Sequence, residues 1–178
     1  MEKENNNRYN NIIKDLKSTD KEKILIAVKQ LRSHGQKESI TDLLDVYISN
    51  EDADIKTSIT NLLFDLKDEK STPILLKAIN DKKYASIKAF LISIFWQSSL
   101  DASEHLGTFI RFAVKGDYNI CLEVFTVIES FDSSFDEDQI QDAIYDIEEK
   151  LDDDELDEEY KKLLYLLKDV VSQLSVEF

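Results

Sequence analysis

IKAFLISIFWQS, residues 87–98, is the stretch that decides the fold of this 178-residue chain. Counted from Ile87, apolar side chains occupy positions one, five, eight and nine, and this spacing places them on one face of an α-helix. The same positions are apolar in IKTSITNLLFDL at 55–66 and in ICLEVFTVIESF at 120–131. These stretches begin 32 residues before and 33 residues after Ile87. A period of this size built from helices is typical of a helical repeat protein.

The rest of the chain continues the helical pattern. Amphipathic helices are also expected around residues 9–16, 21–34, 40–48, 74–79, 106–114, 140–151 and 163–174, with Gly35 ending the second. The last of these helices begins 43 residues after Ile120, and the extra ten residues correspond to an acidic stretch at about 148–159. We therefore predict an all-α fold of five helical hairpins over residues 1–178, a single domain with an acidic loop insertion.

A basic residue follows the first aliphatic residue of two of the repeats. The segments are Asp54-Ile55-Lys56 and Ser86-Ile87-Lys88, and with the order helix, polar loop, helix they resemble HEAT-type repeats. Cys121 takes the place of the basic residue in the next repeat. The resemblance covers nearly the whole chain and implies a right-handed α-α superhelix, a HEAT-like solenoid.

Position ten of these repeats departs from the HEAT-type pattern, in which a small residue occupies that position. It is occupied here by Phe64, Trp96 and Glu129. Residues 96–106, with Asp-Tyr at 117–118, are also similar to small uncharacterised repeat proteins of Bacteroides-like bacteria. That similarity implies no activity.

Composition excludes several protein classes. One Pro and three Gly argue against a turn-rich all-β fold, and 42% apolar residues argue against a disordered chain. No apolar run approaches 18 residues and residues 1–10 are polar, so neither a transmembrane helix nor a signal peptide is expected. Cys121 is the lone cysteine, which fits a reducing compartment. We expect a cytoplasmic protein with no membrane partner.

The net charge of −15 is unevenly placed along the chain. Residues 1–116 carry 18 Lys+Arg against 17 Asp+Glu, whereas residues 117–178 carry 4 against 20. Because the phosphate backbone would be repelled by the C-terminal third, nucleic acid is not an expected partner.

Side chains with catalytic potential are few. His34 and His105 are the two histidines, and Glu104-His105 reverses the repeated His-Glu pairs that some HEAT-type iron hydroxylases use as metal ligands. Cys121 lies beside the apolar stripe without a neighbouring histidine to activate it, which predicts a packed, inert thiol. We expect neither an enzyme nor a bound metal or cofactor.

Two surface features are candidate partner-binding sites. Position ten lies about 155° from the centre of the apolar stripe, so Phe64 and Trp96, with Leu122 at position three, are expected on the outward face of the second helices. In a HEAT-like solenoid this face lines the concave surface; the alternative is that the aromatic rings pack against adjacent repeats. The second feature is a run of four acidic residues in the acidic stretch. It can be a solvated loop, a contact for a basic protein, or a weak cation-binding site. The four residues are Asp152, Asp153, Asp154 and Glu155.

These surfaces favour a non-enzymatic protein–protein interaction or scaffold module, which binds an unidentified protein on its concave face. The alternatives are a helical-repeat enzyme or nucleic-acid repair module, which would need a basic groove or clustered titratable residues, and a purely structural subunit of an assembly. The sequence does not predict the oligomeric state.

Overall fold

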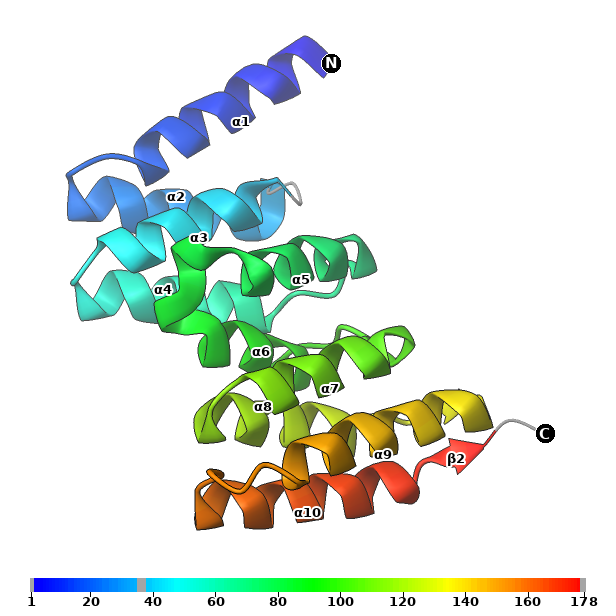
Figure 1. Ribbon diagram of the computed structural model, residues 1–178. Coiled ribbons are helices and arrows are strands. Elements are labelled where there is room, and N and C mark those ends of the chain that lie inside the picture. Colours follow the sequence, from blue (N-terminus) through cyan, green and yellow to red (C-terminus); the bar gives the residue numbers. More distant parts are fainter. Residues whose placement is uncertain (1, 35–37, 177–178) are drawn as a thin grey trace. The chain divides into compact units, whose positions relative to one another are not determined.

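The computed structural model describes residues 2–34 and 38–176, and this part of the chain is almost entirely helical (Figure 1). Gly35, the predicted end of the second helix, lies outside the described residues. The helices are α1 (Glu2–Leu16), α2 (Lys21–His34), α3 (Ser39–Ser49), α4 (Ala53–Phe64), α5 (Thr72–Asn80), α6 (Lys88–Gln97), α7 (Leu106–Lys115), α8 (Tyr118–Glu129), α9 (Glu137–Leu151) and α10 (Glu158–Ser172). The predicted all-α fold is thus confirmed.

Short elements join these helices. Three 3-10 helices are η1 (Glu69–Ser71), η2 (Lys82–Ile87) and η3 (Ser103–His105). Two strands of two residues each, β1 (Ser134–Phe135) and β2 (Ser175–Val176), pair in parallel. No helix within the described residues is both long and apolar enough to cross a bilayer.

The chain divides into two compact units. Unit 1 comprises residues 1–87 and 97–100, and unit 2 comprises residues 88–96 and 101–178. In unit 1, α3 packs between α1 and α5, while α2 packs on α4. In unit 2, α7 packs on α9 and α8 packs on α10. Each unit therefore has two layers of helices, and a single domain over 1–178 stays a prediction.

The apolar positions of the repeats form the core of each unit. In unit 1, Ile55, Ile59, Leu62 and Leu63 are buried. The corresponding residues of unit 2, at positions five, eight and nine, are also buried: Leu91, Ile94, Phe95, Val124, Val127 and Ile128. The repeat stretch that starts at Ile87 is α-helical only from Lys88, because η2 supplies the preceding turns.

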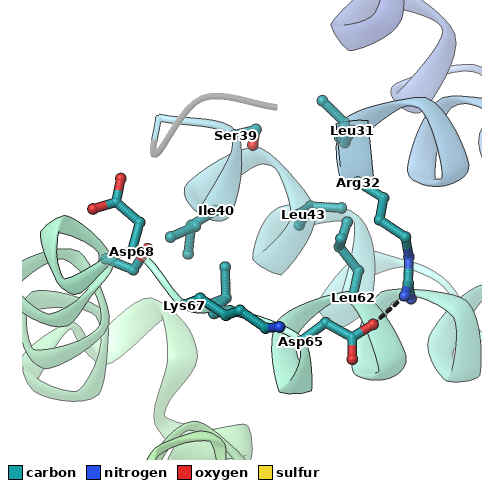
Figure 2. Close-up of a pocket in the computed structure, with 11 residues that line it drawn as sticks. Leu31, Arg32, Ser39, Ile40, Leu43, Leu62, Asp65, Lys67 and Asp68 are labelled. Carbon is teal, nitrogen blue, oxygen red and sulfur yellow. Dashed lines mark hydrogen bonds and ion pairs between the residues drawn. The ribbon is translucent and has the colours of Figure 1, made fainter. Parts of the chain in front are cut away.

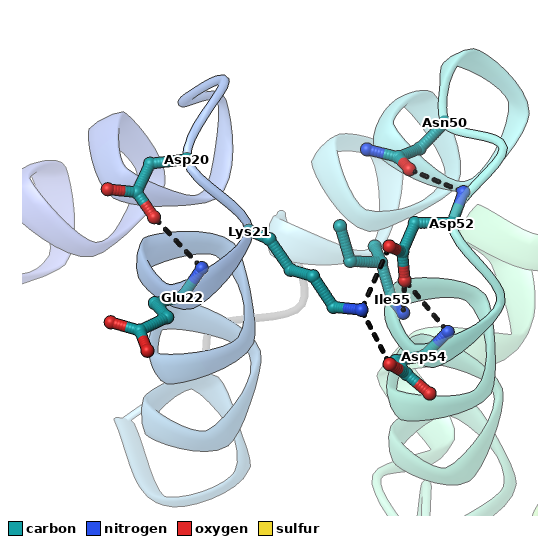
Figure 3. Close-up of polar contacts among 7 residues, drawn as sticks. All are labelled: Asp20, Lys21, Glu22, Asn50, Asp52, Asp54 and Ile55. Atoms are coloured by element: carbon teal, nitrogen blue, oxygen red, sulfur yellow. Dashed lines mark hydrogen bonds and ion pairs between the residues drawn. The ribbon is translucent and has the colours of Figure 1, made fainter.

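Ion pairs between α2 and α4 show how two repeats align in unit 1. Lys21 lies between the carboxylates of Asp52 and Asp54, with Nζ 2.9 Å and 2.5 Å from their Oδ2 atoms (Figure 3). At the other end of the same helices, Arg32 pairs with Asp65. Lys21 and Asp54 are 33 residues apart, as are Arg32 and Asp65. The two helices therefore lie side by side in register, one repeat apart.

The acidic stretch forms a shorter loop than predicted. The helix expected at 140–151 ends at Leu151, as α9 does, but the expected insertion covered about 148–159 and α10 already begins at Glu158, so only residues 152–157 are non-helical. Leu151 is buried and holds the last turn of α9 against the core. Asp157 caps α10 by accepting from the backbone N–H groups of Glu159 and Tyr160. Burial and capping thus extend both helices into the charged stretch.

Candidate functional site

Trp96 is half-buried near the C-terminal end of α6. Its indole Nε1 donates a hydrogen bond to Oε2 of Glu123 in α8, over 2.8 Å. Position ten of one repeat therefore contacts position four of the next within unit 2. The polar edge of the indole is therefore bound to the adjacent repeat. Of the two alternatives, an open surface or packing against an adjacent repeat, this contact partly fits the second.

Leu122 is on the outer side of α8, where it was predicted. Its side chain is 40% exposed, as is that of Tyr118 one turn earlier on the same face. Leu122 and the Trp96 partner Glu123 are consecutive in α8, so the predicted residues Trp96 and Leu122 belong to neighbouring helices of unit 2. Phe64 is a half-buried residue of α4 and belongs to unit 1.

The loop after α9 exposes the four predicted acidic residues, Asp152, Asp153, Asp154 and Glu155. Asp153 accepts from Lys150 Nζ over 2.8 Å and from the backbone N–H of Glu155 over 3.1 Å. These hydrogen bonds lower the pKa of Asp153 below its ordinary value, and the bond from Lys150 has the larger effect. The loop is thus partly ordered by one of its own carboxylates. Among the described residues, no three His, Cys, Asp or Glu side chains gather as a metal site requires.

A second acidic surface, not found from the sequence, lies on α9. Asp138, Asp142, Tyr145 and Glu149 are spaced i, i+4, i+7 and i+11, and all four are exposed. This spacing places them on one side of the helix, away from its buried residues. We call these four residues the acidic face of α9. Tyr145 is 66% exposed there, and its signal in the sequence is an aromatic residue among the polar positions of α9.

The two units differ in net charge. Unit 1 carries as many Lys+Arg as Asp+Glu, 15 of each, and ion pairs such as Lys17–Asp42 and Arg32–Asp65 join its helices. Unit 2 carries 22 Asp+Glu against 7 Lys+Arg, so the whole net charge of −15 belongs to it. Unit 2 also exposes Tyr165 and Leu166 of α10, at 48% and 53%.

The perturbed titratable groups hold helices together. Cys121 is fully buried in α8, and burial raises the pKa of its thiol to about 12, so the thiolate is scarce at neutral pH. Burial also raises the pKa of Tyr160, whose hydroxyl donates to the backbone carbonyl of Ala113 and thereby joins α10 to α7. The predicted packed thiol is confirmed.

The chain has two histidines, His34 and His105. His105 is half-buried at the end of η3, beside the exposed Glu104. The side chain of His34, which closes α2, lies outside the described residues.

Comparison of the chain with protein-family models, with curated protein sequences and with solved structures found no significant match in any of the three. Function is therefore inferred from the surfaces of the chain itself.

Proposed function

We propose that the chain is a non-enzymatic protein-binding module and that unit 2 binds a basic segment of a partner protein. The observation that carries this proposal is Tyr145, 66% exposed in a row with Asp138, Asp142 and Glu149. A lysine or arginine of the partner can lie over the tyrosine ring while carboxylates on either side match its charge. Exposed aromatic side chains are also frequent hot spots of protein interfaces.

The charge of unit 2 supports a basic partner. A net charge of −15 on one unit creates a negative potential that attracts and orients a Lys/Arg-rich segment. The same potential repels a phosphate backbone, which disfavours nucleic acid. Trp96 and Leu122, and the loop residues 152–155, are further candidate contacts within unit 2, and Phe64 is the candidate contact of unit 1.

We further propose that the helices form a right-handed HEAT-like solenoid that acts as a scaffold. The parallel alignment of α2 and α4 supports it, because Lys21–Asp54 and Arg32–Asp65 repeat the same 33-residue offset. The lone buried cysteine supports a cytoplasmic location, where thiols stay reduced.

The alternative functions have less support. An enzyme or a nucleic-acid repair module would place shifted titratable groups at an accessible site. Here the groups with the largest pKa shifts, Tyr84, Cys121 and Tyr160, are buried in helix packing. A purely structural subunit would form an obligate oligomer, which sedimentation analysis of the purified chain tests directly.

Anisotropy with three labelled probes tests the function. They are an amphipathic helical peptide with a Lys/Arg face, the same peptide with Glu in place of its basic residues, and a DNA duplex. We expect the basic peptide alone to bind, with an affinity that falls as salt rises, because exposed charges are screened. DNA binding of equal strength would contradict the proposal and favour the repair module.

Two sets of variants locate the surface. Replacing Asp138 and Asp142 by Asn and Glu149 by Gln should weaken peptide binding at least tenfold. The matched control removes the same charge from unit 1 by replacing the exposed residues Glu22, Glu51 and Glu69 with Gln. Equal losses in both sets would mean that net charge alone attracts the peptide, and the acidic face of α9 would not be the site.

A further inference from the structure

The contact between Trp96 and Glu123 is not repeated at the next junction of unit 2. It joins position ten of the α6 repeat to position four of the α8 repeat. At the junction of α8 and α10 the same two positions are held by Glu129 and, counted from Leu163, by Leu166. The acid and the apolar residue have exchanged places, so no indole covers position four of α10. Leu166 is 53% exposed there, whereas Glu123 is half-buried.

The helices α8 and α10 pack side by side and run in the same direction, so their positions can be compared directly (Figure 1). At the start of α10, the Tyr160 hydroxyl donates to the carbonyl of Ala113, shortly before α8 begins. Beyond the other ends of the two helices, β1 pairs with β2. Positions two, five and nine are buried in both helices: Cys121, Val124 and Ile128, and Leu164, Leu167 and Val171. Both helices therefore turn the same side toward α7 and α9 and the opposite side to solvent.

Large apolar side chains gather on the solvent side of α8 and α10. Of the six that are exposed among the described residues, four belong to these two helices: Tyr118, Leu122, Tyr165 and Leu166. Tyr118 precedes Leu122 by four residues and Glu129 follows it by seven, which places all three on one side of α8. This side contains position ten and, as in the indole contact, faces position four of the next repeat. We call the four exposed residues the apolar patch of unit 2, and neighbouring exposed apolar residues often mark an interaction site.

Acidic side chains surround the apolar patch. Glu129 of α8 and Asp169 of α10 are exposed, and neither forms a hydrogen bond or salt bridge with any described residue. Glu158 and Glu159 are exposed in the first turn of α10. Lys162 is an exposed cation one turn later. Four carboxylates against one cation give the patch a negative border.

Unit 1 arranges charge between its helices in a different way. A cavity of about 220 Å³ opens where the C-terminal ends of α2 and α4 meet the beginning of α3 (Figure 2). Its apolar lining consists of Leu31, Ile40, Leu43, Leu62 and Leu66. Arg32 and Asp65 pair with each other at its border, where Lys67 and Asp68 add one charge of each sign. The border charges cancel, so this cavity does not select a basic or an acidic ligand.

We propose that the apolar patch of unit 2 binds one face of an amphipathic α-helix of a partner protein. Leucine-type side chains of that face pack on Leu122 and Leu166, and lysine or arginine residues along its edge pair with Glu129 and Asp169. Interfaces of this kind use apolar anchors at i, i+3, i+4 and i+7 of the bound helix. Since α9 belongs to the other helix layer of unit 2, this surface is distinct from its acidic face and does not depend on the function proposed above.

Charge complementarity selects this occupant over a second copy of the chain. The border of the patch is acidic and unit 2 has a net charge of −15, so two copies of unit 2 repel each other at this face. A helix with a basic edge removes this repulsion, and its apolar anchors supply affinity that exposed charges alone do not. The bond between Trp96 and Glu123 already pairs a large apolar side chain that carries a donor with a carboxylate of α8.

Fluorescence anisotropy with two labelled helical peptides tests the proposal on the full chain. Both peptides have the same composition and zero net charge, so the overall charge of unit 2 does not attract them. In the first peptide, leucines form one face, lysines flank it and glutamates lie opposite; in the second, the same residues are scrambled and no apolar face is left. We expect the first peptide alone to show saturable binding. No saturable binding, or equal binding of the scrambled peptide, would overturn the proposal.

Exposed residues supply the matched variants. Leu122→Ser and Leu166→Ser should each weaken binding of the first peptide at least tenfold, with unchanged circular dichroism because both side chains are exposed. Glu129→Gln should weaken it about threefold, as expected for the loss of one exposed ion pair. Ile26→Ser, at a 55% exposed position of unit 1, and Asp142→Asn, on the acidic face of α9, should bind the peptide as the unmodified chain does. Unchanged binding by both leucine variants would show that the peptide binds elsewhere.

Sedimentation of the chain without peptide tests a second copy as the occupant. We expect a monomer at the concentrations where the first peptide binds. A dimer that Leu166→Ser dissociates would mean that the apolar patch joins two copies of the chain, and the proposal would be wrong.

Discussion

Trp96 and Glu123 form a hydrogen bond between two repeats of unit 2, with the indole Nε1 2.8 Å from the carboxylate Oε2. The acceptor is a carboxylate, which makes this a charge-assisted bond. Both side chains are half-buried, which leaves part of the interaction screened by water. An aromatic residue at the outward position ten is thus used to join α6 to α8.

Removal of the acceptor should destabilise the chain modestly. We predict that Glu123→Ala lowers the free energy of unfolding by about 1 kcal/mol, the usual net contribution of one hydrogen bond. Urea denaturation measures it. The control is Glu129→Ala, an exposed glutamate further along α8, which should change stability by less than about 0.5 kcal/mol. Equal effects of the two variants would mean that the Trp96 contact contributes nothing.

The contrast between the core and Trp96 shows what the sequence could predict. Spacing fixed the buried face of each helix, because Ile59, Leu63 and their equivalents follow the helical period. The environment of Trp96 could not be predicted in the same way. A helical wheel places a residue relative to its own core stripe, but burial at position ten depends on how closely the next helix packs beside it.

Other features were hidden for related reasons. The acidic composition at about 148–159 suggested a long loop before a helix at 163–174, yet Asp157 caps α10, which begins at Glu158. Tyr145 lies opposite the buried stripe of α9, and the helical period that identifies the stripe carries no information about which exposed residues contact a partner. The cavity of unit 1 joins Arg32 to Asp68 across 36 residues, and local spacing carries no information about such a distance.

Asp45 should make the stability of unit 1 depend on pH. Its carboxylate accepts from the hydroxyl of Tyr84 over 2.6 Å and pairs with Lys83. Burial by itself raises the pKa of Asp45, but the hydrogen bonds from Lys83 and Tyr84 and the charges of Lys83 and Lys17 hold it below its ordinary value. Since the folded pKa lies below the unfolded value, the stabilisation is present above about pH 4 and is lost as the pH falls through the folded pKa.

We therefore predict that Asp45→Asn is less stable than the unmodified chain at pH 6, and that this difference narrows between about pH 5 and pH 2. Urea denaturation across this range measures the difference. Asp15→Asn, at an exposed carboxylate of α1 with no ion pair in the described chain, should show no comparable narrowing. A constant difference for Asp45→Asn would contradict the role of its ionised form.

The Tyr160 hydroxyl should contribute measurably to the packing of α10 on α7. Tyr160→Phe removes the donor to the Ala113 carbonyl and keeps the ring, which is 6% exposed. We expect a loss of about 1 kcal/mol in the free energy of unfolding, with an unchanged dependence on urea concentration. Tyr165→Phe alters an exposed tyrosine of the same helix and should be neutral. A neutral Tyr160→Phe would show that the hydroxyl is equally well solvated in the unfolded chain.

Cys121 should be unreactive until the chain unfolds. With a pKa of about 12, on the order of one thiol in ten thousand is ionised at pH 8, and the side chain is fully buried. We expect a thiol-specific disulfide reagent to label the native chain slowly and the urea-unfolded chain at once. A Cys121→Ala chain with Tyr118→Cys, at a 40% exposed position of α8, should be labelled rapidly without urea. Rapid labelling of native Cys121 would disagree with its burial.

The loop between α9 and α10 should be the first site cut by a Glu-specific protease. Residues 152–157 are non-helical, and Glu155 is the one glutamate among them, whereas Glu148 and Glu159 lie in helices. Because a protease needs an accessible and locally extended backbone, we expect the first cleavage after Glu155, identified by mass spectrometry of early digests. Glu155→Gln should delay the first cut, while Glu51→Gln, at an exposed glutamate of unit 1, should leave its position and rate unchanged. First cuts within residues 55–131 would contradict the stable helical repeats assigned there.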